Sequence, residues 1–327
     1  MDTRGALVDD RSSQHDTVEC GNDTETIMHL TVAICTWNRS RLLAQTLTQM
    51  TTLRVPENTT WELLVIDNNS TDDTPAVTAS FDGRLPVRRL FEPTPGVCNA
   101  RNLAVKEASG LYVLWTDDDV LVEPTWMAGY VAAFLRRPSA GFFGGVIRPW
   151  FPQDPPEWLR RGFDPVASAY AARDLGPEEM PLSAEQLPYG ANMAVRIEEQ
   201  RAFPYDVSLG PRPGSTMRGE ETDLFLRMIS QGVAGSWVPD AIVRHYIPPE
   251  RQSVSYLRGF YKGLGEYYAL AESPPTGPRL FGKPRWVWRS AIQNEAMYRI
   301  GRAFGRPEKW VPKLRDASVA WGRLINA

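Results

Sequence analysis

The sequence predicts an α/β fold: a Rossmann-like, mostly parallel central sheet with flanking helices, followed by a helical, basic C-terminal extension. Two observations predict it. From Leu30 onward, short apolar runs alternate with helical patterns, as in strands joined by crossover helices. The 327 residues carry a net charge of −3, yet Arg251–Ala327 holds 14 Lys and Arg against 5 Asp and Glu. A basic appendage therefore follows an acidic body.

The expected strands are short apolar runs, and several of them end in polar side chains. They are Leu30–Cys35, Trp61–Ile66, Val87–Phe91, Leu111–Trp115 and Phe142–Ile147. In an open α/β sheet, ligands bind at the carboxyl ends of the strands. The polar residues that follow the first, second and fourth runs are therefore candidates for a functional site.

Helices are expected between and after these strands. Apolar spacing predicts them over Arg41–Met50, Asn99–Ala108, Pro124–Arg136 and Glu220–Ser230. Pro124 suits the first position of its helix, because that position needs no backbone N–H. Prolines cluster with tryptophans in residues 149–188, which predicts an irregular insertion there.

Three segments follow from these patterns: a disordered polar leader over residues 1–27, a globular body over 28–250 and a helical extension over 251–327. No apolar run approaches the length of a membrane span, and the leader lacks the order of a signal peptide, which predicts a cytoplasmic protein. Cys20, Cys35 and Cys98 show no metal-ligand spacing, so neither a disulfide framework nor a zinc finger is expected.

Three consecutive aspartates, Asp117–Asp119, follow the fourth expected strand. Like carboxylates in one place repel each other unless a cation neutralises them, and oxygen ligands suit Mg²⁺ or Mn²⁺. The alternative is a capping aspartate with solvated neighbours before the helix at Pro124. No glycine-rich phosphate loop follows any strand, so a bound nucleotide would have to be held through a metal ion.

Six segments in order resemble the family 2 glycosyltransferases, over residues 30–245. They are TVAICTWNR, LLVIDNNSTDDT, PGVCNARNLAV, VLWTDDDV, YGANMAVR and RGEETDLFLRM. The resemblance implies a GT-A fold, with a nucleotide-binding part over about 28–120 and an acceptor-binding part over about 121–250. It also implies a nucleotide-sugar donor, a Mn²⁺ or Mg²⁺ cofactor and transfer with inversion at the anomeric carbon.

The resemblance assigns the donor nucleotide to seven positions: Thr36, Trp37, Arg39, Asp67, Arg101, Asp117 and Asp118. It places Thr36 and Trp37 against the nucleobase and Arg101 near the base and pyrophosphate. It has Asp67 accept from the ring N–H of the base, which suits a UDP-sugar. The alternative for Trp37 is a core residue.

The metal ion is assigned, by the same resemblance, to Asp119, Asp117 and His245. Asp119 matches the direct ligand of the family's Asp-x-Asp motif, Asp117 a ribose or metal-water contact, and His245 a third ligand found in some members. A structural or surface histidine is the alternative at position 245.

Catalysis requires a base for the acceptor hydroxyl. The family has this base at the second acid of a Gly-Glu-Asp motif, which here is Gly219-Glu220-Glu221, so Glu221 is the expected base and Glu220 the reserve. Either glutamate alone would more simply be a first-turn partner of the helix dipole.

The acceptor and the donor sugar are expected to contact Asn192, Gly190 and Trp150. A buried asparagine with all its hydrogen bonds made inside the protein is the rival interpretation of Asn192.

The expected reaction is addition of one sugar to a hydroxyl in cell-surface polysaccharide or glycolipid assembly, because the family's processive Gln-x-x-Arg-Trp motif is absent from the sequence. A nucleotidyltransferase and a non-catalytic glycan- or nucleotide-binding protein are the alternatives. Basic residues interleaved with tryptophans in the tail are typical of a helix lying on an anionic membrane, where a lipid-linked acceptor would reside. An amphipathic helix packed on the body is the other interpretation, and no nucleic-acid partner is expected.

Overall fold

The computed structural model describes residues 27–215, 217–271 and 278–326, so the predicted leader, apart from Ile27, lies outside the described residues. The strands of the main sheet are β1 (Met28–Thr36), β2 (Thr59–Asp67), β3 (Val87–Phe91), β4 (Tyr112–Asp117), β5 (Val120–Val122), β6 (Phe142–Trp150), β7 (Pro181–Leu182), β8 (Met193–Arg196) and β9 (Gly235–Tyr246). Their spatial order is β3-β2-β1-β4-β8-β6-β9-β5, with β7 paired to β9.

The helices in the body of the protein are α1 (Ser40–Met50), α2 (Thr74–Ala79), α3 (Val97–Glu107), α4 (Trp126–Arg136), α5 (Glu157–Arg161), α6 (Ile197–Ala202) and α7 (Glu220–Ser230). Short 3₁₀ helices are η1 (Asp164–Tyr170), η2 (Gly190–Asn192) and η3 (Pro249–Arg251). Three long helices follow: α8 (Val254–Ala271), α9 (Arg285–Phe304) and α10 (Pro307–Asn326), with the hairpin of β10 (Arg279–Leu280) and β11 (Lys283–Pro284) before α9.

The N-terminal half of the sheet is parallel, because helices connect its strands. β1 pairs in parallel with β2 and with β4, and β2 with β3. The register sets Thr36 beside Asp67 and Cys35 beside Asp117. The polar residues after the first and fourth expected strands therefore meet at one edge. β8 then runs antiparallel between β4 and β6, which makes the sheet mixed.

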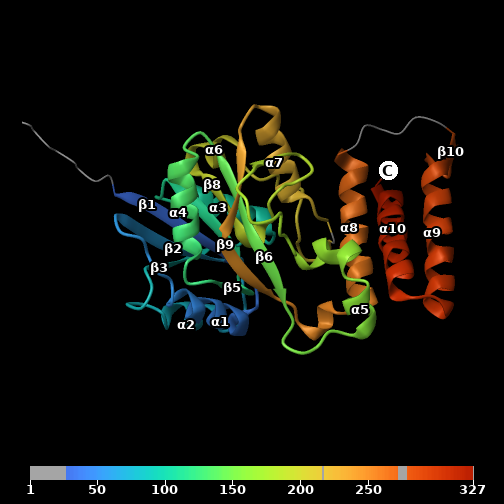
Figure 1. Ribbon diagram of the computed structural model, residues 1–327, viewed down its shortest axis with the longest axis horizontal. Coiled ribbons are helices and arrows are strands. Elements are labelled where there is room, and N and C mark those ends of the chain that lie inside the picture. Colours follow the sequence, from blue (N-terminus) through green and yellow to red (C-terminus); the bar gives the residue numbers. More distant parts are fainter. Residues whose placement is uncertain (1–26, 216, 272–277, 327) are drawn as a thin grey trace, which may run out of the picture.

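Alternation along each strand divides the core into two layers. In β1, Leu30, Val32 and Ile34 face the layer that also contains apolar residues of α1 and α4. Ala33 faces the opposite layer, which contains residues of α3 and α7. The predicted α/β architecture with flanking helices is confirmed, and Figure 1 shows helices on both faces of the sheet.

Two local expectations need correction. The helix predicted from Pro124 begins at Trp126, because Pro124 and Thr125 form a turn in which the N–H of Trp126 donates to the carbonyl of Glu123. The insertion over residues 149–188 is not wholly irregular, since it contains α5, η1 and the short strand β7.

The C-terminal extension is a bundle of three helices, as predicted from the sequence of residues 251–327. α10 packs against both α8 and α9, and the three stand side by side at one end of the molecule (Figure 1). Gly265 and Gly322 allow the close approach of α8 to α10, because a Cβ at either position would strike the backbone of the other helix. Leu257 and Tyr261 of α8 share a core with Leu159 and Tyr170 of the insertion, which holds α8 beside the carboxyl edge of the sheet.

Candidate active site

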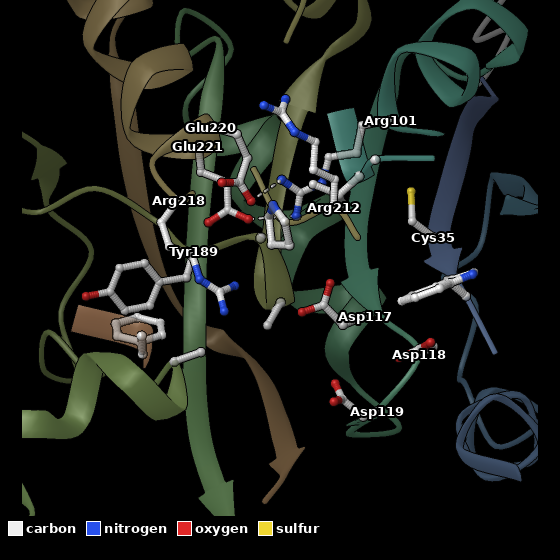
Figure 2. Close-up of a pocket in the computed structure, with 18 of the residues that line it drawn as sticks. Cys35, Arg101, Asp117, Asp118, Asp119, Tyr189, Arg212, Arg218, Glu220 and Glu221 are labelled. Atoms are coloured by element: carbon white, nitrogen blue, oxygen red, sulfur yellow. Dashed lines mark hydrogen bonds and ion pairs between the residues drawn. The ribbon is translucent and has the colours of Figure 1, made fainter. Parts of the chain in front are cut away.

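A cavity of about 810 Å³ opens at the carboxyl ends of β1 and β4 (Figure 2). Its walls come from the N-terminal ends of α3 and α7, from η1 and from one face of α8. Segments that are far apart in the sequence therefore surround one space. Its size is in the range of ligand-binding pockets.

The three aspartates at the end of β4 divide into two groups. Asp118 turns toward β1, where it accepts a hydrogen bond from Thr36 (2.8 Å) and pairs with Arg39 (2.7 Å). Ligand atoms of Asp117, Asp119 and His245 lie within 4.8 Å of one another. The alternative of a capping aspartate before the helix at Pro124 does not fit, because β5 follows the triplet directly and α4 begins only at Trp126.

His245 is oriented by the backbone of the insertion. Its Nδ1 lies 2.9 Å from the carbonyl oxygen of Tyr170, which fixes the hydrogen on Nδ1. Its Nε2 then presents a lone pair, 3.3 Å from a carboxylate oxygen of Asp119. A ring nitrogen held by a backbone carbonyl is the usual arrangement of a metal-binding histidine. Two carboxylates and one imidazole therefore fit a divalent ion with positions left for water or phosphate.

The electrostatics of the triplet distinguish its members. Burial raises the pKa of Asp118 to about 6, and burial together with Asp119 raises the pKa of Asp117. Burial acts in the same direction on Asp119, but His245, Arg251 and Arg39 outweigh it and hold its pKa well below the usual range. Asp119 is therefore the carboxylate that stays ionised and ready to bind a cation.

A proton at His245 competes with a metal ion. Although burial opposes it, Asp119 raises the pKa of His245 above its ordinary value of 6.5. We therefore expect Mn²⁺ affinity to strengthen as pH rises through this pKa, by up to about tenfold per pH unit below it. Calorimetric Mn²⁺ titrations from mildly acidic to mildly basic pH test this. His245→Gln, which does not titrate, should bind more weakly with a flatter profile, and an unchanged slope would contradict the prediction.

The two glutamates that open α7 face Arg101. Glu221 Oε1 lies 2.6 Å from a guanidinium nitrogen of Arg101, and Glu220 Oε1 lies 3.6 Å from the other. Gly190 lies directly against this pair, and a side chain there would collide with both Glu221 and Arg101. Figure 2 shows both carboxylates directed at Arg101, with Asp117 across the cavity. Both glutamates also lie in the first turn of α7, where the helix dipole favours them.

The residues expected to bind the donor lie in different surroundings. Trp37 lines the cavity and is 48% exposed, so the alternative of a core residue is wrong. Arg101 also lines the cavity, and its guanidinium is engaged by the two glutamates. Arg39 bridges Asp118 and Asp119, and so ties the loop after β1 to the loop after β4.

The expectation that Asp67 binds a nucleobase is not supported by its surroundings. Asp67 is fully buried and lies outside the cavity lining. One of its oxygens accepts from Arg89 of β3 (2.6 Å), and the other accepts from the backbone N–H of Ser70. The next residue, Asn68, does line the cavity, and its side chain holds the loop at Gly96 in place. The sequence analysis missed Asn68, because the partners of its side chain are backbone groups of residues distant in the sequence.

Asn192 is a structural residue, as the rival interpretation had it. It is fully buried, its Oδ1 accepts from Trp126 and Tyr130, and its Nδ2 donates to the carbonyls of Val146 and Ala241. All four of its hydrogen-bonding positions are thus used inside the protein. Trp150 also lies outside the cavity, at the end of β6, with its ring against Tyr246. Of the three expected sugar contacts, only Gly190 lines the cavity.

Replacing Asn192 with leucine should destabilise the protein by about 3 kcal/mol or more, because buried donors on Trp126 and Tyr130 lose their acceptor. Chemical denaturation measures the change in the free energy of unfolding. Asn192→Asp should also destabilise the protein, because its second oxygen would face the carbonyls of Val146 and Ala241, to which Nδ2 now donates. Wild-type stability combined with loss of sugar transfer would instead place Asn192 in the substrate site.

Several lining residues were not predicted from the sequence. Arg251 lies 3.0 Å from Asp119 and 3.2 Å from His245, and Arg218 extends into the cavity between Tyr189 and Asp117 (Figure 2). One face of α8 completes the wall. The four-residue spacing of its large apolar side chains was a signal for that face, but the sequence does not say what the face packs against.

Comparison with known proteins agrees with this geometry. Residues 31–191 match the family model described as glycosyl transferase family 2. The chain is 25% identical over 252 residues to the succinoglycan biosynthesis protein ExoM of Rhizobium meliloti, covering 75% of this chain and 76% of that protein. It is 29% identical over 182 residues to the validoxylamine A glucosyltransferase of Streptomyces hygroscopicus, covering 55% of this chain and 37% of that protein.

A solved structure shares the fold. The mannosyltransferase PcManGT from Pyrobaculum calidifontis, in complex with GDP-Man and Mn²⁺, superposes with a TM-score of 0.62 at 18% identity. The match covers 91% of this chain and 86% of that one, so it extends beyond the segment that the family model covers and includes much of the C-terminal extension.

Proposed function

Because the chain belongs to glycosyl transferase family 2 and is a GT-A-type glycosyltransferase, we propose that it moves one sugar, with inversion, from a nucleoside diphosphate donor to a hydroxyl acceptor in a metal-dependent reaction. One observation carries the proposal: the Asp117, Asp119 and His245 cluster and the glutamates of α7 face the same cavity. A metal-binding cluster and a carboxylate base are the two groups that such a displacement requires.

Asp119, Asp117 and His245 would hold the divalent ion, with Asp119 as the ionised carboxylate. When bound, Mn²⁺ or Mg²⁺ supplies positive charge that stabilises the departing nucleoside diphosphate. Trp37, exposed at the mouth of the cavity, would cover the nucleobase. The solved relative's complex with GDP-Man and Mn²⁺ supports a donor of this class.

Glu221 would take the proton of the acceptor hydroxyl. Its Oε1 is held by Arg101, and among the described residues its Oε2 has no partner. The side chain of Glu221 is 22% exposed, against 10% for Glu220, so Glu221 is the more accessible of the two. Arg101 would orient the carboxylate so that the second oxygen points into the cavity.

The identity of the donor is best settled by direct binding. Calorimetry with UDP-, GDP- and dTDP-sugars, each with Mn²⁺, with Mg²⁺ and with chelator, should reveal one donor that binds only with metal. The UDP preference expected from Asp67 stays a prediction for this panel, although Asp67 is paired with Arg89. Failure of every donor to bind with metal would overturn the proposal, and formation of a nucleotide-sugar with pyrophosphate release would favour a nucleotidyltransferase.

We further propose that the acceptor is lipid-linked and that α9 contacts an anionic membrane. None of the helices within 27–215, 217–271 and 278–326 is long and apolar enough to cross a bilayer. α9 is the outermost helix of the bundle (Figure 1). Trp286, Ile300 and Phe304 on it are 46%, 65% and 92% exposed, and arginines such as Arg289 flank them. The name of ExoM, a succinoglycan biosynthesis protein, supports a role in polysaccharide assembly.

Part of the tail packs inward, since Trp310 is buried and Trp288 stacks edge-on with Trp321. Only the outward-facing residues of α9 can therefore contact lipid. Flotation with vesicles that contain phosphatidylglycerol should recover the protein, and Phe304→Glu should reduce that recovery. Leu135→Glu, at a 69% exposed position on α4, is the control. Equal flotation of both variants would rule out α9 as the contact.

A further inference from the structure

One cation of the active-site cavity has no polar partner. Five arginines line the described cavity: Arg39, Arg101, Arg212, Arg218 and Arg251. Among the described residues, Arg218 is the one of these five that makes neither an ion pair nor a hydrogen bond, and its Nε is buried without an acceptor. A buried N–H that loses water without gaining an acceptor is costly. Arg218 is therefore the arginine that a bound ligand can still neutralise.

The other four arginines are already engaged. Arg39 and Arg251 contact carboxylates of the aspartate triplet. Arg101 contacts the two glutamates of α7. Arg212 donates to two backbone carbonyls of its own loop, at 3.2 and 3.0 Å. Each of these four thus has a role within the protein that Arg218 lacks.

Arg218 lies against one face of α8. Tyr256, Phe260, Leu264 and Tyr268 occur at every fourth position of this helix, are partly exposed and line the cavity, and we call this face the α8 wall. The guanidinium of Arg218 lies 5.2 Å from the centre of the Phe260 ring. The ring attracts the cation but offers it no acceptor oxygen. The α8 wall therefore holds the guanidinium in place and leaves its N–H groups for another partner.

The backbone after Arg218 is fixed as well. Gly219 has a φ of +100°, and a Cβ there would overlap the ring of Tyr267 on α8. Glycine suits this position on both counts. Glu221, the proposed base, lies three positions after Arg218 on the same short segment. The unpartnered guanidinium and the proposed base are thus held together against α8.

Arg218 also lies away from the strand end that leads to the proposed nucleobase site. In the view of Figure 2, Arg218 and Tyr189 are on one side of Asp117, and Cys35 of β1 is on the other. Trp37, proposed to cover the nucleobase, follows β1 directly. The donor is therefore expected to extend from β1 to the metal cluster, which leaves Arg218 on the side where the acceptor would approach the base.

We propose that Arg218 binds an oxyanion of the acceptor, a phosphate or a carboxylate carried close to the reacting hydroxyl. A planar guanidinium matches the paired oxygens of such a group. Neighbouring Phe260 and Leu264 lower the local dielectric, which strengthens the charge pair. In a lipid-linked acceptor, a phosphate that joins sugar to lipid belongs to this class. The inference deepens the proposed function and rests on it, since it needs a bound donor and a base at Glu221.

The first test uses the full chain with Mn²⁺ and the donor found by the binding screen. The 1-phosphates of glucose, galactose, mannose and N-acetylglucosamine, together with octyl glucuronide, are compared with the octyl glycosides of the same four sugars. We expect the best anionic compound to have a kcat/KM at least about tenfold above that of its neutral counterpart. Preference for a 1-phosphate identifies the oxyanion as a phosphate, and preference for the glucuronide identifies it as a carboxylate.

Two outcomes of this test overturn the proposal. One is equal or faster transfer to the neutral glycosides, and the other is donor binding without transfer to any anionic compound. Absence of donor binding would instead indicate failure of the proposed function.

Variants of Arg218 separate the acceptor from the donor. Arg218→Ala should raise the KM for the preferred anionic acceptor at least about tenfold and leave the Kd of the donor within about twofold. Arg218→Lys keeps the charge but not the planar fork, so it should show a smaller rise in KM, also if Arg218→Ala does not fold. Arg54→Ala, exposed and outside the cavity lining, is the matched control for the loss of one arginine. A comparable rise in the Kd of the donor would assign Arg218 to the donor's phosphate and overturn the proposal, as would an unchanged KM in both variants.

Discussion

Asp119→Asn is expected to remove metal-dependent donor binding and to lower transfer by about 10²–10³-fold. Asp119 is 3% exposed, its carboxylate lies 3.3 Å from His245, and its pKa is held low, so it is the anionic centre of the cluster. An amide keeps the shape of the side chain but removes the charge. Calorimetric Mn²⁺ titration and initial rates with saturating donor measure the two effects.

Asp118→Asn is the matched control, because Asp118 points away from the cluster toward Thr36 and Arg39. It should leave Mn²⁺ affinity much closer to that of the wild type. An equal loss of metal binding in both variants would mean that the triplet acts as one acidic patch and that the assignment to Asp119 is wrong.

Replacing Arg251 is expected to change Mn²⁺ affinity in the opposite direction. Its guanidinium contacts both Asp119 and Nε2 of His245, the two groups to which a metal ion would bind. A divalent ion must compete with this positive charge, so Arg251→Ala should bind Mn²⁺ more tightly than the wild type. Weaker binding in Arg251→Ala would show that the arginine supports the metal site.

The sequence was sufficient for the parts of the site that strand order determines. Parallel pairing of β1 with β4 places Cys35 beside Asp117, so motifs at the ends of two separate apolar runs had to meet. The same reasoning also selected Asp67, which ends a correctly predicted strand but is buried and does not line the cavity. Its neutralising partner, Arg89, comes from the neighbouring strand β3, and only the register of β2 with β3 shows that the two side chains meet.

Tertiary contacts decide the remaining assignments. Asn192 lies in a segment that the family resemblance led us to expect beside substrate, yet Trp126 and Tyr130 of α4 use its oxygen. The α8 wall depends on packing between α8 and the insertion, a contact between distant segments that no local pattern encodes. Periodicity shows which face of a helix is apolar, but it does not show whether that face meets a core or a cavity.

Glu221→Gln is expected to lower kcat by about 10²–10⁴-fold while the Kd of the donor stays near the wild-type value. The amide is similar in size and can still contact Arg101, but it cannot accept the proton of the acceptor hydroxyl. Because Glu221 is more exposed than Glu220, its loss should cost more than that of its neighbour. Single-turnover transfer and calorimetric donor titration separate chemistry from binding.

Glu220→Gln is the decisive comparison, since burial and the nearby charge of Glu221 raise the pKa of Glu220 above its ordinary value. Accessibility favours Glu221, whereas the raised pKa of Glu220 favours Glu220, so the two single variants place the base. We expect Glu220→Gln to retain most of the transfer rate, because its carboxylate is the more enclosed and its contact with Arg101 is the longer, at 3.6 Å against 2.6 Å. An inactive Glu220→Gln beside an active Glu221→Gln would move the base to Glu220 and make Glu221 the residue that positions Arg101.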